Sequence, residues 1–155
     1  MQFDDYMQIR DLMNRYAHLA DQARIDELAQ LFEHADFYLP GNVVFRHDPK
    51  GFADNLKQWS RTYEDTGTMR TRHVTTNLIL EDDGPNAAKA QSYVVVFQAT
   101  PDFPLQPVIA GTYLDRFEKV DGKWRFTERR EDDKNFELLG DLSRHLKQNY
   151  DPRLR

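Results

Sequence analysis

The sequence contains no cysteine among its 155 residues. Disulfide bonds, thiolate nucleophiles and thiolate metal ligands are therefore excluded. The seven glycines are scattered as single residues, so the chain has no glycine-rich loop of the kind that cradles phosphate groups. We therefore expect chemistry that needs no cofactor.

Long apolar runs are also missing. No stretch approaches the roughly 20 apolar residues that a membrane-spanning helix needs. The first five residues, Met1 to Asp5, lack the basic start and apolar core of a signal peptide. We expect a cytoplasmic protein that has no membrane partner.

The chain has no excess of positive charge. Its 21 Lys and Arg residues and 26 Asp and Glu residues give a formal net charge of −5. Binding to a phosphate backbone needs a basic face, and the one short basic cluster, Arg129-Arg130, is flanked by Glu128 and Glu131. Nucleic acid is therefore not an expected partner.

The sequence shows no spacing typical of metal ligands. His34, Asp36, His47 and Asp48 lie near one another, but no two histidines stand at i and i+4 on a predicted helix, as they do in many zinc enzymes. We therefore predict no metal site.

Aromatic residues, in contrast, are abundant. Ten Phe, seven Tyr and two Trp make up 12% of a chain in which 30% of residues are charged. A chain of this length folds as one domain and buries roughly 70% of the surface that its unfolded form exposes. The rings need a packed interior or a ligand to cover them, so we predict one domain, residues 1–155, with room for a small-molecule pocket.

The first half of the chain is predicted to be mainly helical. Apolar residues recur at three- and four-residue spacing over three segments: about 5–20, 23–34 and 51–63. Asp4 or Asp5 can cap the first helix, and Asp21 falls at the corner between the first two. Residues 36–41 are predicted to form a short strand that ends in the turn Pro40-Gly41.

The second half is predicted to be an antiparallel meander. From about residue 68 the apolar period changes to two, and turn signals divide the chain into four strands: about 70–81, 87–100, 107–120 and 123–133. Asp121-Gly122 predicts a tight hairpin, because the favoured turns need positive φ there. Helices followed by such strands indicate the α+β class. Leucines in the tail predict a final helix or lid over about 135–150.

Three motifs occur in a fixed order along the chain. They are Tyr16-Ala-His-Leu-Ala-Asp21, then Thr71-Arg-His73-Val-Thr-Thr-Asn77-Leu, then Gly111-Thr-Tyr113-Leu-Asp115-Arg116-Phe, which is followed by Asp121-Gly-Lys-Trp124-Arg-Phe. Over about residues 5–135 the chain resembles the SnoaL-like branch of the nuclear transport factor 2-like superfamily. That branch includes scytalone dehydratase, the bile-acid dehydratase, the hexachlorocyclohexane dehydrochlorinase, polyketide cyclases and small subunits of ring-hydroxylating dioxygenases. The resemblance implies a cystatin-like cone, in which N-terminal helices pack on a strongly curved antiparallel sheet around a pocket.

The resemblance also implies a catalytic pair. In the dehydratase and dehydrochlorinase members, an Asp after the first helix orients a His on the first long strand, and this His removes a proton. Asp21 and His73 occupy these positions, and Tyr16 matches a Tyr that contributes in some dehydratases. A carboxylate on one ring nitrogen stabilises the imidazolium that forms. In the alternative interpretation, Asp21 caps the second helix and His73 bonds within the sheet.

Five further residues are candidates for substrate binding. Strand alternation places Asn77 on the same face as His73. The others are aromatic or basic residues that could contact a substrate, although each could instead serve packing or surface ion pairs: Tyr38, Trp59, Tyr113 and Arg130, or Arg129 in its place.

We therefore expect a cofactor-independent, dehydratase-like lyase or an isomerase that abstracts a proton from a cyclic or polycyclic apolar substrate. Two alternatives stay open. One is a non-catalytic binding or assembly subunit, such as the small subunit of a ring-hydroxylating dioxygenase, and the other is a polyketide-cyclase-like isomerase. Val94, Val96 and their neighbours supply more apolar surface than three short helices can cover, so we expect a dimer or trimer through the outer face of the sheet.

Overall fold

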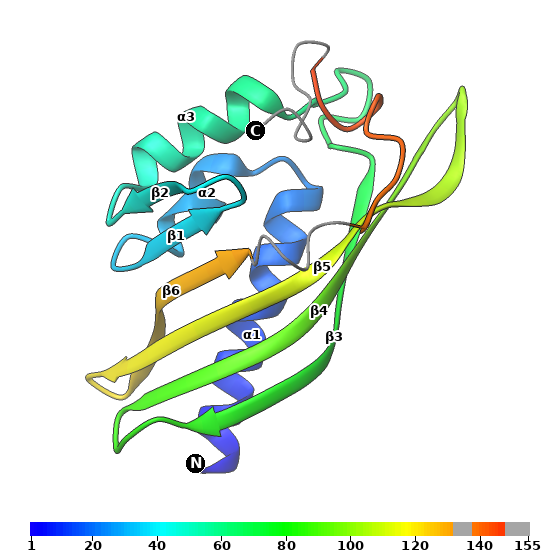
Figure 1. The fold of residues 1–155 in the computed structure, drawn as a ribbon. Coiled ribbons are helices and arrows are strands. Elements are labelled where there is room, and N and C mark those ends of the chain that lie inside the picture. The colour runs from blue at the N-terminus through cyan, green and yellow to red at the C-terminus, as the bar shows by residue number, and fades with distance from the viewer. Residues whose placement is uncertain (132–137, 148–155) are drawn as a thin grey trace.

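The structure is a computed structural model that describes residues 1–131 and 138–147. Figure 1 shows the helices beside a long, bent sheet. Within the described residues the elements are, in chain order, α1 (Phe3–Asp21), α2 (Ile25–Gln30), β1 (Asp36–Leu39), β2 (Val43–Arg46), α3 (Pro49–Trp59), β3 (Thr71–Asp82), β4 (Ala87–Thr100), β5 (Phe103–Val120), β6 (Lys123–Glu131) and β7 (Leu138–Leu139).

The strands form one mixed sheet in the order β2-β1-β6-β5-β4-β3, and β7 pairs with β5. The antiparallel meander from β3 to β6 confirms the predicted order. The whole sheet is mixed, because β1 lies parallel to β6, and β2 is a second short strand that the sequence analysis missed. Many residues separate β1 from β6 along the chain, so β1 can pair with β6 in either direction. A tight hairpin, in contrast, forces its two strands to pair antiparallel.

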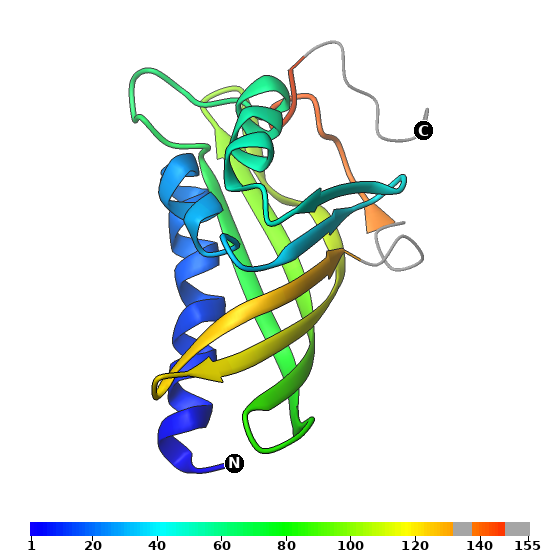
Figure 2. The same cartoon turned by 90° about the vertical axis from the view of Figure 1, so that its left-hand side faces the viewer.

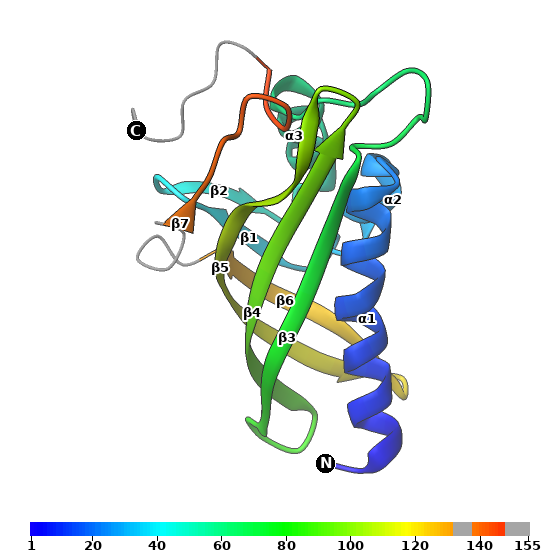
Figure 3. The same ribbon diagram turned by 90° about the vertical axis from the view of Figure 1, so that its right-hand side faces the viewer.

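The sheet curves around α1, which contacts both β3 and β6. Figures 2 and 3 show α1 running the length of the long strands. Its buried stripe has helical spacing: Ile9, Met13, Tyr16 and Ala20. Gln2 is the N-cap, and Asp5 accepts its backbone N–H at 3.2 Å in a capping box, so Asp5 acts from the first turn rather than at the cap position predicted for it. None of the described helices is long and apolar enough to cross a membrane.

The other two helices differ from prediction at their ends. Ala23 has φ of 55°, a left-handed conformation that stops any helix from running through it, so α2 begins at Ile25. Asp48 caps α3 by accepting the backbone N–H of Gly51 at 2.8 Å, with Pro49 at the first helical position. The turn at residues 121–122 is confirmed, with φ of 50° at Asp121 and 78° at Gly122.

β5 begins earlier than predicted, at Phe103, and includes two prolines. Along this end β5 pairs with β4 on one side, and on the other side β7 reaches only Ile109 and Ala110. Proline lacks the N–H that an inner strand needs, so Pro104 and Pro107 are tolerated where no described strand pairs with β5 on its second side. The predicted strand start at about residue 107 was therefore wrong.

The tail also departs from prediction. Of the segment predicted as a helix or lid, residues 138–147 contain β7, a turn and a β-bridge between Leu146 and Ser60, and no helix. The remainder, 132–137 and 148–155, lies outside the described residues. In Figure 1 the described part of the tail passes close to the end of the sheet where α1 ends.

Val94 and Val96 face the interior and are 1% and 2% exposed, so the prediction that they form the outer surface was wrong. The register of β4 decides this, because alternate residues point to opposite faces. The outer face instead carries exposed apolar side chains of the intervening positions, among them Val74, Ile79 and Tyr93.

Candidate functional site

Asp21 and His73 form a hydrogen-bonded pair inside the cone. Asp21 is the last residue of α1 and His73 is the third residue of β3. His73 Nδ1 lies 2.6 Å from Asp21 Oδ1. The carboxylate also accepts the His73 backbone N–H at 3.0 Å and the Thr71 hydroxyl at 2.8 Å. Several donors therefore fix the carboxylate in place.

The backbone brings these two residues together across 52 positions of sequence. The Met69 backbone N–H donates to the Asp21 carbonyl at 3.2 Å, which ties the start of β3 to the end of α1. Arg70 adopts φ of 55°, a left-handed turn just before the strand. The alternative in which Asp21 caps α2 does not hold, because the N-cap of α2 is Arg24 and no side chain caps that helix.

The hydrogen bonds of the pair affect the pKa of Asp21 and leave one nitrogen of the His73 ring exposed to a ligand. Burial alone would raise the pKa of Asp21, but the hydrogen bonds and charge of His73 outweigh it, so the pKa lies below its usual value. A neutral His73 that donates Nδ1–H to the carboxylate has its lone pair on Nε2. No hydrogen bond between described residues engages Nε2, and the His73 side chain is 11% exposed. The ring can therefore accept a proton through Nε2.

Tyr16 and Tyr113 stand beside the pair. The Tyr16 ring lies 6.3 Å from the His73 ring and 5.8 Å from the Tyr113 ring, edge-on in both cases. Both tyrosines are buried, and burial raises their pKa values above the usual range, while their hydroxyl groups hydrogen-bond to each other. The two tyrosines therefore place a hydrogen-bonded pair of hydroxyl groups next to the His73 ring.

A buried ion pair adjoins the tyrosines. Arg129 Nε and Nη2 donate to the two Asp115 carboxylate oxygens, each at 2.8 Å, and both side chains are 1% exposed. The guanidinium lies 4.3 Å from the Tyr16 ring centre and 4.1 Å from that of Tyr113. Sequence reasoning proposed Arg129 only as a substitute for Arg130 and missed this pairing.

Tyr38 and Arg130 lie together on the opposite side of their strands. The Arg130 guanidinium stacks 3.7 Å from the Tyr38 ring centre, and the two residues are register partners. Their strand neighbours Phe37 and Arg129 are the ones that contact Tyr16. The structure therefore does not bring Tyr38 or Arg130 to the dyad.

Asn77 lies apart from the position expected of it, whereas Trp59 lies beside the tail. Asn77 is exposed, has φ of 54°, and sits where the β3–β4 register shifts between Thr76 and Ile79. This bulge interrupts the alternation that placed Asn77 beside His73. Trp59 ends α3, and its backbone carbonyl accepts the Lys147 N–H at 2.9 Å.

His145 is a residue that the sequence analysis did not identify. Its side chain is buried, and burial together with the charge of His73 lowers its pKa to about 4, while Asp21 partly opposes this shift. Both members of the dyad therefore lie within electrostatic range of His145. His145 lies in the leucine-containing tail and belongs to no motif, so no sequence signal indicated that it lies near the dyad.

Across residues 1–131 and 138–147, no group of three or more His, Asp or Glu side chains is placed to hold a metal ion. Asp36, from the segment weighed as a metal site, instead pairs with Arg46 at 2.5 Å and lies 3.7 Å from His47 Nε2.

Known proteins share this fold. The protein Rv3472 of Mycobacterium tuberculosis, of unknown function, is 30% identical over 84% of this chain and 72% of its own, with a TM-score of 0.67. A proposed scytalone dehydratase from Novosphingobium aromaticivorans is 24% identical over 81% of this chain and 80% of its own, with a TM-score of 0.61. The beta subunit of a proposed aromatic-ring-hydroxylating dioxygenase from the same organism is 21% identical over 81% and 86%, with a TM-score of 0.62.

No curated protein matches the chain. The model of the SnoaL-like domain, however, matches residues 1–130, which include α1, His73 and the whole meander up to Arg130. The chain therefore belongs to the SnoaL-like domain family, whose nuclear transport factor 2-like relatives share the cystatin-like fold seen here.

Proposed function

We propose that this protein is a cofactor-independent lyase or isomerase in which His73 is the general base and Asp21 its orienting partner. The observation that carries the proposal is the 2.6 Å contact between His73 Nδ1 and a carboxylate held by several donors. This arrangement fixes the tautomer that presents Nε2 as the base, and it stabilises the imidazolium that forms.

The reaction begins when Nε2 takes a proton from a carbon next to an electron-withdrawing group. The C–H bond breaks, an N–H bond forms on His73, and the electron pair enters a new double bond. In a lyase the pair expels a leaving group from the adjacent carbon, with water as the example in a dehydratase. In an isomerase the proton returns at another carbon. Tyr16, whose ring lies 6.3 Å from the His73 ring, would donate its hydroxyl to the substrate oxygen that gains negative charge.

The surroundings of His73 favour an apolar, cyclic substrate. Across the sheet, His73 pairs with Val96 and Thr75 pairs with Val94, and both valines face the interior. The edge-on aromatic rings of Tyr16 and Tyr113 supply further apolar surface nearby. Such a lining suits a ring compound that carries a few oxygen atoms. The similarity to a proposed scytalone dehydratase supports the same substrate class.

Deuterium exchange tests the base whatever the leaving group is. The protein is incubated in D2O with a panel of cyclic ketones that includes 2-tetralone, and exchange next to the carbonyl is followed by NMR. His73→Ala should slow enzyme-dependent exchange by on the order of 10²-fold or more. His47→Ala, which changes an exposed histidine, is the control. Unchanged exchange in His73→Ala would end the base hypothesis.

The second candidate is a non-catalytic assembly subunit. It is favoured by the similarity to a dioxygenase beta subunit and by the exposed apolar side chains Val74, Ile79 and Tyr93 on the outer face of the sheet. On this interpretation the chain forms a homo-oligomer through that face. The protein then accelerates deuterium exchange in none of the cyclic ketones of the panel. Tyr93→Asp should then lower the mass seen by light scattering, whereas a wild-type monomer at micromolar concentration would contradict the assembly.

A further inference from the structure

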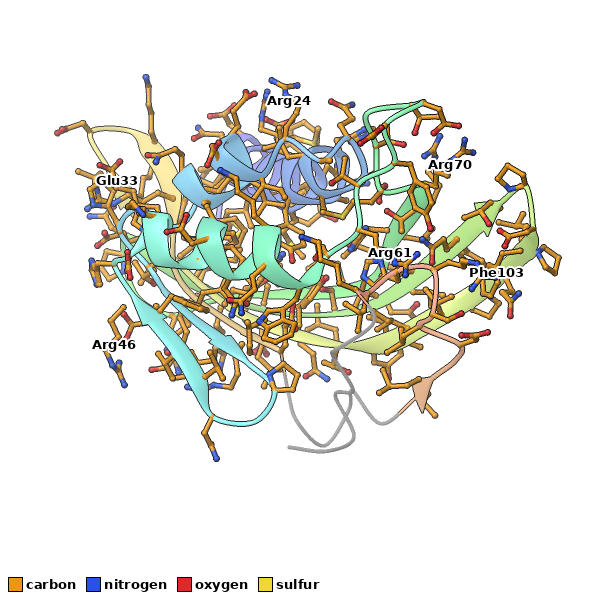
Figure 4. All side chains as sticks on the ribbon, turned by 90° about the horizontal axis from the view of Figure 1, so that it is seen from above. Arg24, Glu33, Arg46, Arg61, Arg70 and Phe103 are labelled. Carbon is orange, nitrogen blue, oxygen red and sulfur yellow. The ribbon has the colours of Figure 1, made fainter. Side chains whose placement is uncertain are left out.

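The segment that contains His145 is held across the end of the sheet mainly through its backbone. The Arg61 backbone N–H donates to the His145 carbonyl at 2.9 Å, and Arg61 Nε donates to the Leu146 carbonyl at 2.8 Å. The Tyr63 hydroxyl donates to the Arg144 carbonyl at 2.6 Å. Figure 4 shows Arg61 beside this segment. These contacts fix the position of His145 without using its side chain.

Gln98 connects this segment to the dyad. Its Nε2 donates to the Arg144 carbonyl at 2.8 Å and to the Met69 carbonyl at 3.2 Å. Gln98 is also the register partner of Thr71, whose hydroxyl donates to Asp21. The backbone next to His145 therefore lies close to Met69, which is bonded to the end of α1, and the His145 side chain is buried.

Two buried polar atoms here have no partner among the described residues. They are Nδ1 of His145, a residue 8% exposed, and Oε1 of Gln98, a residue 1% exposed. The hydrogen bonds determine which atom of the Gln98 amide is nitrogen and which is oxygen. Nε2 donates to two carbonyl oxygens, so the other atom is Oε1, which can only accept. Buried polar atoms are nearly always hydrogen-bonded in proteins, and these two belong to residues joined through the Arg144 carbonyl, so they are candidates to bind one polar ligand group.

We propose that His145 Nδ1 and Gln98 Oε1 form a subsite for a hydroxyl group of the ligand, beside the His73–Asp21 pair. A hydroxyl group donates one hydrogen bond and accepts others, so it can donate to Gln98 Oε1 and accept from His145 Nδ1–H. The low pKa of His145, about 4, keeps this imidazole neutral, so it binds without taking the proton from His73. The subsite rests on the proposed function, and it narrows the substrate to a hydroxylated ring compound.

The subsite would discriminate between ligands of equal shape. A hydroxylated ring satisfies both buried atoms, whereas the same ring with a methyl group leaves them unpaired. The matched probes are p-cresol and p-xylene, and NMR shifts of the full-length protein give both dissociation constants. The measured quantity is the ratio of the p-xylene constant to the p-cresol constant, which reports on the hydroxyl group alone.

Two substitutions of His145 separate its polar role from its packing role. His145→Phe keeps the ring shape and removes both nitrogens, so it should lower the ratio about three- to tenfold, the usual effect of one hydrogen bond. His145→Asn places an amide near the position of Nδ1 and should retain most of the preference. His34→Phe makes the same change at an exposed position and should leave the ratio unchanged.

The outcomes distinguish this proposal from the proposed function. An unchanged ratio in His145→Phe overturns the subsite, even if His73→Ala abolishes exchange. A ratio that depends on His145, combined with unchanged exchange in His73→Ala, supports the subsite in a binding protein and removes the base. If His145→Phe does not fold, His145→Asn is compared with Gln98→Leu, which removes the acceptor Oε1 of the subsite. A ratio that falls as far in His145→Asn as in Gln98→Leu supports packing alone and overturns the subsite. Failure of wild-type protein to bind either probe overturns the subsite, while the exchange assay still decides the proposed function.

Discussion

The interior of the sheet holds two carboxylate–base pairs that differ in what they can do. Asp115 and Arg129 are each 1% exposed and joined by two hydrogen bonds, and aromatic rings cover the guanidinium. Asp21 and His73 are 12% and 11% exposed and joined through one ring nitrogen. Arginine keeps its proton under all physiological conditions, whereas histidine gains and loses one near neutral pH.

This difference assigns the pairs to different tasks. Burial would lower the pKa of Arg129, but the charge of Asp115 raises it above its ordinary value, so the pair stays ionised. A pair of this kind fixes the strands that carry it and exchanges no proton. The Asp21–His73 pair has a ring nitrogen left for chemistry, so function should fail there before stability does.

The largest expected effect comes from breaking the Asp115–Arg129 pair. Asp115→Ala leaves the Arg129 charge buried without a partner, and this should cost about 3–5 kcal/mol of unfolding free energy. Urea unfolding followed by circular dichroism measures the loss. The double variant Asp115→Leu with Arg129→Met should recover much of it, because no buried charge remains. A loss below about 1 kcal/mol in Asp115→Ala would show that the pair is not structural.

The second-largest expected effect is a loss of folding stability in acid, which we expect to come from His145. The pKa of His145 in the folded protein is about 4, below the usual 6.5, so the unfolded chain binds the proton first as the pH falls. Stability should fall by about 3 kcal/mol between pH 6.5 and 4, since each unit of pKa shift is worth about 1.4 kcal/mol. His145→Phe should flatten this slope. An equal slope in both proteins would place the acid sensitivity elsewhere.

Asp21→Asn should separate activity from stability. The amide can hold the His73 ring but cannot stabilise the imidazolium, so exchange should fall on the order of 10²-fold, or about 2.7 kcal/mol of activation free energy. Wild-type Asp21, with its lowered pKa, adds stability above pH 3.8 that is lost as the pH falls through its folded value. The melting temperature at neutral pH should nevertheless drop less than in Asp115→Ala. The opposite ranking would reverse the roles of the two pairs.

Tyr16 lies beside both pairs, and removal of its hydroxyl should have the smallest effect on exchange and stability. Tyr16→Phe keeps the ring over Arg129 and beside His73 but removes the hydroxyl shared with Tyr113. Exchange should slow about tenfold, the scale of one hydrogen bond to a charged oxygen, with a stability change under about 1 kcal/mol. A large loss of stability with normal exchange would show that the hydroxyl serves packing.

Much of the fold could be predicted from local patterns. The buried stripe of α1, the strand order from β3 to β6 and the turn at Asp121-Gly122 depend on periodicity and turn chemistry within a few residues of one another. The candidate dyad came from ordered motifs rather than from geometry, since Asp21 and His73 are 52 positions apart. The sequence thus determined the α+β class, the family and the two residues to examine.

Only the tertiary structure decided which side chains share a face. A register shift after Arg116 places Asp115 opposite Arg129, although counting back from the tight turn would pair Asp115 with Glu128. The β3 bulge moves Asn77 away from His73, and the packing of the tail brings His145 within electrostatic range of the dyad. Because side chains alternate with a period of two, one extra residue reverses the faces beyond it, and long-range packing sets where that residue is tolerated.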